Sequence, residues 1–239
     1  MARNTHLRSP SRLIDESAMT SEWTNRFLST AEFFALAKAR LSLNAPEALT
    51  DPHIIPHDND EDADPAVLAA IAAMRPIRTA AVLVPIIARA EPTVLFTQRT
   101  AHPSDHAGEI AFPGGKIDAV DASPAAAALR EAEEEVSLDR RFVEPIGYLD
   151  VHVTPSGYRI LPVLARVREG FSVRFGRDEV NDTFEVPLAF LMAPQNHRRE
   201  KADWNGLITS VYAISFNDRK IWGVTAGILR NLWERIYRA

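Results

Sequence analysis

Three glutamates near the middle of the sequence have a spacing that could bind a metal ion. Glu131, Glu134 and Glu135 lie in the stretch AAAALREAEEEVSL, whose apolar residues recur with helical periodicity. Because a helix turns by about 100° per residue, the three carboxylates fall within an arc of about 100°, opposite an apolar stripe. Adjacent anions on a helix repel one another, and a divalent cation would convert this repulsion into coordination. An acidic cluster on a helix is more often a solvated face, so the surrounding residues must distinguish a metal site from a solvated surface.

The segment before this helix favours the metal site. The residues FPGG at 112–115 predict a tight turn, in which glycine permits a close approach of the backbone. Asp118 and Asp121 follow, and Ser123-Pro124 is a typical helix start, with a capping hydroxyl and a proline at the first helical position. The chain has no cysteine, so thiol nucleophiles, disulfides and iron–sulfur clusters are excluded and any metal must bind oxygen or imidazole. Mg²⁺ is therefore the expected ion, with Mn²⁺ as a substitute.

Apolar and β-branched runs predict the strands that would position the helix. These strands cover 80–88, 93–99, 143–151, 158–166, 183–187, 208–216 and 219–224. The first two form a predicted hairpin, and a polar loop is expected at 100–109. Helices are predicted at 20–43, directly after 187 and at 225–238. This order predicts an α/β (α+β) fold with a mixed central sheet between helical layers.

The composition sets the domain organisation and excludes several classes of partner. Residues 1–18 are predicted to be a disordered arm, 19–75 an N-terminal helix followed by an acidic linker with four prolines and five aspartates at 45–65, and 76–239 the globular domain that carries the glutamate helix. The formal net charge of -5 excludes the strongly basic surface of a general nucleic-acid binder. No apolar run reaches the roughly 18 residues that suggest a membrane span. We expect a soluble, cytoplasmic protein with neither nucleic acid nor membrane as partner; a homodimer is left open.

The residues around the helix resemble the signature of the Nudix hydrolases. The Nudix box has a glycine, five residues, a glutamate, seven residues and then Arg-Glu-apolar-any-Glu-Glu-any-Gly-apolar, and Gly115 followed by REAEEEVSL at 130–138 is similar to it. Three features depart from the pattern: the interval from Gly115 to Arg130 is one residue longer, Asp121 stands near the expected glutamate, and Ser137 replaces the late glycine. The resemblance implies a Nudix-type α/β/α sandwich with a catalytic loop-helix-loop.

A second signature resembles the coenzyme A diphosphatase branch of that family. LFTQR at 95–99 and HAGEIAFPGG at 106–115 are similar to the branch motif, and the stretches 154–163, 184–197 and 221–229 extend the resemblance over roughly 78–235. Ser104 stands where the branch usually has Arg, and Glu109 where it often has Gln. The first change loses a cation and the second gains an anion, and both weaken the case for a polyanionic ligand at this place.

The resemblance implies metal-assisted hydrolysis of a pyrophosphate. Glu131, Glu134 and Glu135, together with the carbonyl of Gly115, would hold one to three Mg²⁺ ions. The catalytic residues would be Glu131, Arg130 and Glu134. Arg130 would orient Glu131 through a bidentate ion pair, while Glu131 could serve as a metal ligand or as the general base.

Substrate-binding residues are expected on the neighbouring loops. Gly114 would offer its backbone, and Arg99 could bind a phosphate or cap the loop after its strand. His106 could hydrogen-bond a phosphate or brace the loop at Gly108. Glu179 stands where other Nudix enzymes place a late carboxylate, although a solvated glutamate is equally consistent with the sequence.

Coenzyme A or acyl-coenzyme A is the first-choice substrate, cleaved to adenosine 3′,5′-bisphosphate and 4′-(acyl)phosphopantetheine. The Nudix box specifies pyrophosphate chemistry and not the flanking groups, so ADP-ribose and dinucleotide polyphosphates are alternatives. A further alternative is a Nudix-fold regulator that binds a nucleotide without turnover. The intact trio of glutamates argues against that alternative, because a pure binder has no need for three repelling anions.

Overall fold

A computed structural model of the protein describes residues 28–54, 56, 65–100, 108–154, 156–174, 180–204 and 206–238. The predicted arm at 1–18 and the first residues of the helix predicted at 20–43 lie outside the described residues. Ser104, His106 and Glu179 also lie outside them.

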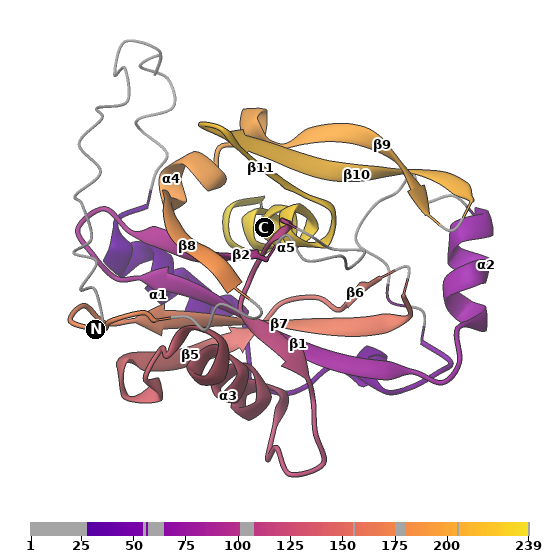
Figure 1. Ribbon diagram of the computed structural model, residues 1–239, viewed down its shortest axis with the longest axis horizontal. Coiled ribbons are helices and arrows are strands. Elements are labelled where there is room, and N and C mark those ends of the chain that lie inside the picture. Colours follow the sequence, from indigo (N-terminus) through magenta and orange to yellow (C-terminus); the bar gives the residue numbers. More distant parts are fainter. Residues whose placement is uncertain are drawn as a thin grey trace.

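The central sheet is mixed, as predicted, and carries helices on both faces (Figure 1). Its strands are β1 (Arg78–Ile87), β2 (Thr93–Arg99), β3 (Ile110–Ala111), β4 (Gly114–Lys116), β5 (Val143–Tyr148), β6 (His152–Val153), β7 (Tyr158–Val167) and β8 (Val180–Pro187). β1 and β7 are parallel along their whole length, and the other pairs are antiparallel. Both strands are almost continuously apolar because side chains on both of their faces are buried.

The sheet forks between β1 and β2. β1 pairs with β2 only at Ile86 and Ile87, whereas its first half pairs with β4. β3 pairs with the far end of β2, and the chain crosses the fork between β3 and β4 through Phe112 and Pro113. The tight turn predicted at FPGG is therefore wrong, because the two glycines form a strand against β1. A side chain at Gly114 would collide with the Ala81 carbonyl, so β4 can lie this close to β1 only with glycine there.

Helices cover the two faces of the sheet. α3 (Pro124–Val136) packs on one face, where Ala128, Ala132 and Leu161 are buried in one core cluster. α1 (Thr30–Arg40) and α5 (Gly223–Trp233), which continues as a π-helix over Glu234–Arg238, pack on the other face. α1 confirms the described part of the helix predicted at 20–43. In the described part of the chain, no helix is long and apolar enough to cross a membrane.

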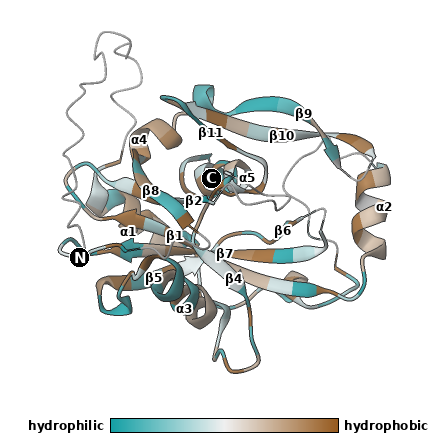
Figure 2. Ribbon diagram, in the orientation of Figure 1, coloured by the Kyte–Doolittle hydropathy of each residue, from teal (hydrophilic) through white to brown (hydrophobic). Residues whose placement is uncertain are grey.

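A second, antiparallel sheet of three strands lies beside α5 (Figure 1). It consists of β9 (Arg198–Trp204), β10 (Leu207–Phe216) and β11 (Arg219–Trp222), and the short helix α4 (Leu188–Leu191) leads into it. Short 3-10 helices occur at Glu47–Leu49, Arg140–Phe142 and Pro194–Asn196. The sequence predicted β10, β11 and α4 but neither β9 nor the peripheral helix α2 (Pro65–Ala73), which contains no charged residue (Figure 2).

We predict that α1 contributes strongly to stability, because Phe33 is fully buried in the core that contains Leu229 of α5. Phe33→Ala should lower the free energy of unfolding by about 3–5 kcal/mol through lost burial and a residual cavity. Lys38→Ala is the matched control on the same helix: Lys38 pairs with Glu144 at 2.7 Å, but both side chains are half exposed. That variant should change stability by less than about 1 kcal/mol. Denaturant unfolding measures both values, and equal losses would contradict the prediction.

Candidate active site

α3 presents the three glutamates because its ends and its buried face are fixed. The Ser123 hydroxyl accepts a hydrogen bond from the Ala126 N–H, and Pro124 occupies the first helical position, which confirms the predicted start. The helix ends at Val136, and the capping residue Ser137 adopts the left-handed conformation with φ 53°. The apolar stripe of α3 is buried against the sheet, while Glu131 and Glu135 lie against β4 and Glu134 bonds to Arg130.

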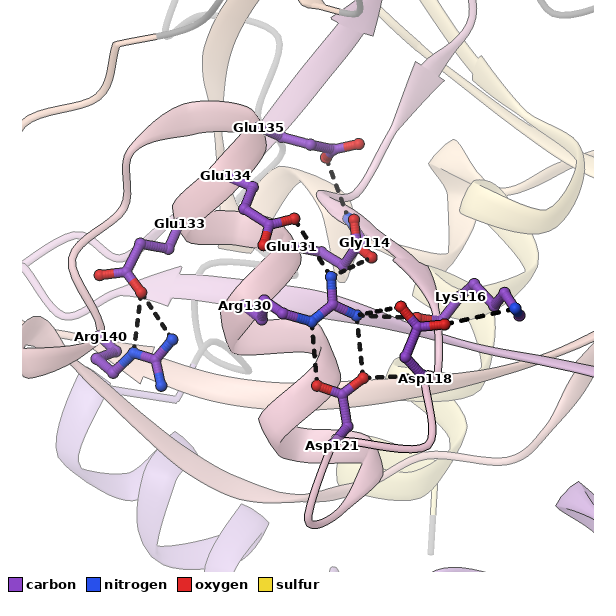
Figure 3. A network of polar contacts seen from close by, with 10 residues as sticks. All are labelled: Gly114, Lys116, Asp118, Asp121, Arg130, Glu131, Glu133, Glu134, Glu135 and Arg140. Atoms are coloured by element: carbon purple, nitrogen blue, oxygen red, sulfur yellow. Dashed lines mark hydrogen bonds and ion pairs between the residues drawn. The ribbon is translucent and has the colours of Figure 1, made fainter.

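The guanidinium of Arg130 is the centre of a polar network (Figure 3). Its Nε and Nη2 donate to the two carboxylate oxygens of Asp121, at 3.0 Å each. Its Nη1 donates to Glu131 Oε1 at 2.8 Å and to Glu134 Oε2 at 3.2 Å. Nη2 also donates to the Lys116 carbonyl at 3.1 Å. One side chain thus connects the helix, the preceding loop and β4.

The predicted bidentate pair between Arg130 and Glu131 is wrong. The two parallel donors of the guanidinium bind Asp121, and Glu131 receives a single hydrogen bond. Consecutive residues on a helix do not face each other. Asp121, by contrast, approaches the Arg130 guanidinium from the loop and can bind two of its nitrogens. The bonds to Asp121 and Glu131 raise the pKa of Arg130, which is charged at every physiological pH.

Asp121 is a member of the site to which the sequence assigned no role. Its side chain is only 5% exposed, and its Oδ2 accepts a hydrogen bond from the Asp118 N–H at 2.9 Å, which closes the loop before α3. Hydrogen bonds from Arg130 lower the pKa of the Asp121 carboxyl, although burial opposes this shift. The signal that could have identified Asp121 was its position near the glutamate of the Nudix box.

Gly114 and Gly115 form a backbone cradle for two of the glutamates. The Gly114 N–H donates to Glu135 Oε2 at 3.2 Å. A Cβ at Gly115 would lie 2.5 Å from the carboxyl carbon of Glu131 and 2.6 Å from its Oε2. Glycine at 115 therefore leaves the space that the Glu131 carboxylate occupies beside the strand.

The three carboxylates share one face of α3 but do not yet converge on one point. Among the described residues, no group of three acidic or histidine side chains is close enough to hold a common ion. Hydrogen bonds account for this arrangement: Glu131 and Glu134 meet at Arg130 Nη1, while Glu135 binds the Gly114 N–H. Helix geometry predicted the shared face correctly, but it does not determine the side-chain rotamers.

The donors at this face fit a hard divalent cation. All are oxygens: the carboxylates of Glu131, Glu134 and Glu135, beside the backbone of Gly115. Glu134 is 59% exposed and Glu131 18%, so one carboxylate reaches solvent while the other is held in the cradle. Glu133, by contrast, points away from the cradle and pairs with Arg140 at 2.7 Å (Figure 3).

The remaining predicted residues surround this face unevenly. Arg99 ends β2, where its N–H donates to the Glu109 carbonyl and its Cα pairs with Val180 at the start of β8. Gly114 lies in β4 beside Glu135. His106 and Glu179 lie outside the described residues, so their predicted contacts stay predictions.

A family model for the NUDIX domain matches residues 77–205, more than half of the chain. The chain belongs to the Nudix family. It is similar to the uncharacterized Nudix hydrolase NudL of Escherichia coli (strain K12), with 42% identity over 155 residues, which cover 65% of this chain and 81% of that protein. Among solved structures it resembles a Nudix hydrolase from Alicyclobacillus acidocaldarius (18% identity, TM-score 0.42, 70% of this chain and 96% of that one). It also resembles a C. elegans Ap4A hydrolase binary complex (20% identity, TM-score 0.40, 46% and 80%).

The protein is therefore a Nudix hydrolase and has the Nudix fold. Members of this family act on nucleoside diphosphate derivatives and generally need divalent metal ions. Its departure from the Nudix box at Ser137 has a structural cost. The position requires a left-handed residue, since φ is 53°, and glycine adopts this conformation without strain while serine does not.

We predict that Asp121 stabilises the fold in a pH-dependent way. Because its pKa is lower in the folded protein than the unfolded value of about 3.9, its contribution is present above that value and is lost as the pH falls through the folded pKa. Asp121→Asn should therefore be less stable than the wild type near pH 7, and the difference should shrink below about pH 4. Urea unfolding between pH 7 and pH 2.5 measures it. A difference that does not vary with pH would contradict the prediction.

Proposed function

We propose that this Nudix hydrolase cleaves the pyrophosphate of coenzyme A or acyl-coenzyme A, with Mg²⁺ as cofactor and Mn²⁺ as a substitute. The products would be adenosine 3′,5′-bisphosphate and 4′-(acyl)phosphopantetheine. The observation that carries the proposal is the pairing of the two halves of the second signature: Thr97 lies opposite Ala111 and Gln98 opposite Ile110. The second half ends in the Gly114–Gly115 cradle beside the glutamates of α3.

Glu131, Glu134, Glu135 and the Gly115 carbonyl would hold the metal. When bound, the cation would neutralise the pyrophosphate and activate the attacking water. Binding would require Glu134 and Glu135 to turn from their present hydrogen bonds toward Glu131. The bond from Arg130 to Glu134 is exposed and the bond from Gly114 to Glu135 is only partly buried, so breaking them costs little compared with the attraction of three carboxylates to a divalent charge.

The other residues of the site would position the reactants. Arg130 would hold Glu131 in the cradle, whether Glu131 is a ligand or removes the proton from water as general base. Gly114 would bring its backbone close to the substrate. Arg99, His106 and Glu179 are the proposed side-chain contacts to the substrate. Arg99 is exposed at the end of β2, where its guanidinium could bind a phosphate.

The choice of coenzyme A rests on the motif at 95–115 and has two competitors. ADP-ribose and dinucleotide polyphosphates share the same pyrophosphate chemistry, and Ser104 removes a cation that the coenzyme A branch usually has. A regulator without turnover would not need Glu131, Glu134 and Glu135 to remain together, so catalysis is favoured.

We predict that the charge of two glutamates is essential for turnover. Glu135→Gln and Glu131→Gln preserve side-chain shape but remove the charge that binds the metal, and each should reduce kcat by at least about 100-fold at matched Mg²⁺. Glu133→Gln is the matched control on the same helix, since Glu133 pairs with Arg140 and points away from the cradle. It should turn over at nearly the wild-type rate. Wild-type rates in Glu135→Gln and Glu131→Gln would contradict the proposed metal site.

We predict that coenzyme A and acyl-coenzyme A are the preferred substrates in a panel that includes ADP-ribose and diadenosine polyphosphates. Steady-state kcat/KM for each compound, with products resolved by mass, measures this preference. The expected products from coenzyme A are two phosphomonoesters. If ADP-ribose is cleaved far faster than coenzyme A, the Nudix chemistry stands and the coenzyme A assignment is rejected.

A further inference from the structure

Arg219 connects the second sheet to the strand that carries the proposed coenzyme A motif. It lies on β11, beyond the residues matched by the NUDIX family model. Its Nη1 donates to Gln98 Oε1 on β2 at 2.8 Å, and its Nη2 donates to Asp182 Oδ2 on β8 at 2.7 Å. Its guanidinium carbon lies 4.0 Å from the centre of the Phe184 ring. A planar guanidinium can make two hydrogen bonds with its edge while its face lies on the ring, a geometry that the compact ammonium group of lysine does not reproduce.

A hydrogen-bonded route leads from Arg219 to the segment that enters the glycine cradle. With its Oε1 bound by Arg219, the Gln98 side chain directs its Nε2 to the Gly108 carbonyl at 3.3 Å. The next residue on β2, Arg99, donates its backbone N–H to the Glu109 carbonyl at 3.0 Å. Arg219 therefore helps to fix where the chain returns to the sheet before β3 and β4.

A route through packed rings leads to the same place. Phe184, which lies under the guanidinium of Arg219, stacks on Phe96 with the ring centres 5.5 Å apart. Phe96 stacks on Phe112 at 5.0 Å. Phe112 is followed directly by Pro113 and Gly114, so the end of this stack is the start of the cradle. Close-packed rings transmit displacements because there is little free volume to absorb them.

The cradle has little tolerance for displacement. The Glu131 carboxylate already occupies the place where a Cβ at Gly115 would stand, and the Gly114 N–H lies 3.2 Å from Glu135. We propose that Arg219 is a positioning residue that holds the Gly114–Gly115 backbone in register with the glutamates of α3 and so sets the affinity of this site for a divalent cation. The inference builds on the metal site of the proposed function, but it does not depend on which substrate is cleaved.

The test is a titration of Mn²⁺ into the metal-free protein, followed by electron paramagnetic resonance, with thermal unfolding measured in parallel. Arg219→Met should raise the Kd for Mn²⁺ roughly three- to tenfold and lower kcat by on the order of tenfold, with KM changed less. Arg219→Lys should bind Mn²⁺ more tightly than Arg219→Met but less tightly than the wild type. The matched control is Lys220→Met, on the same strand, because Lys220 pairs with Glu200 on β9 at 2.6 Å and is half exposed. It should bind Mn²⁺ as the wild type does.

A second variant, Gln98→Leu, tests the hydrogen-bonded route while Arg219 keeps its contacts with Asp182 and Phe184. It should weaken Mn²⁺ binding as well, and it serves in place of Arg219→Met if that variant does not fold. A loss of melting temperature with unchanged Mn²⁺ affinity in Arg219→Met or Gln98→Leu would overturn the inference, because it would show a purely structural role. Failure of the wild type to cleave coenzyme A would reject the proposed substrate. The comparison of Mn²⁺ affinity between the wild type and the variants would still test the role of Arg219.

Discussion

The arrangement of the site depends on one guanidinium. Arg130 binds Asp121 with two parallel hydrogen bonds, binds Glu131 and Glu134 through a single nitrogen, and donates to the Lys116 carbonyl. It therefore compensates three carboxylates that would otherwise repel one another in a region where its own side chain is only 23% exposed. Since those partners belong to a helix, a loop and a strand, the same interaction that limits electrostatic repulsion also fixes the relative positions of the three elements.

The two glycines of β4, at the fork of the sheet, provide the space in which this network forms. β4 can lie against β1 because Gly114 has no side chain, and the Glu131 carboxylate can lie against β4 because Gly115 has none. The backbone thus occupies space that side chains would normally fill, and the Gly114 N–H donates to the Glu135 carboxylate there. A charged cluster on a helix face is ordinarily solvated; here it is enclosed on one side by the backbone of β4.

Local signals in the sequence predicted α3 well and its partners poorly. The Ser123 cap, the following proline and the periodicity of the apolar residues gave the start and the buried face of the helix, because these depend only on neighbouring residues. The predicted bidentate partner of Arg130 was wrong because the actual partner, Asp121, lies nine residues upstream and is positioned by the path of a loop. β9 was missed because RREKADW is an edge strand whose mostly exposed, charged side chains lack apolar alternation, and α2 because PAVLAAIAA has no polar face to reveal a helical period.

The core extends beyond the residues that carry the family signature, and this has consequences for the site. Phe33 of α1, Phe96 of β2 and Leu229 of α5 belong to one buried cluster, although only Phe96 lies within the matched NUDIX domain. The face of β2 opposite α3 would be exposed without α1, α5 and the second sheet, and Phe112, which precedes the glycine cradle, packs in that same cluster. Phe112 is therefore buried in a cluster to which segments outside the Nudix box contribute. Packing from outside the Nudix box thus supports the segment that carries its glycines toward the glutamates of α3, so the box alone does not account for the position of that segment.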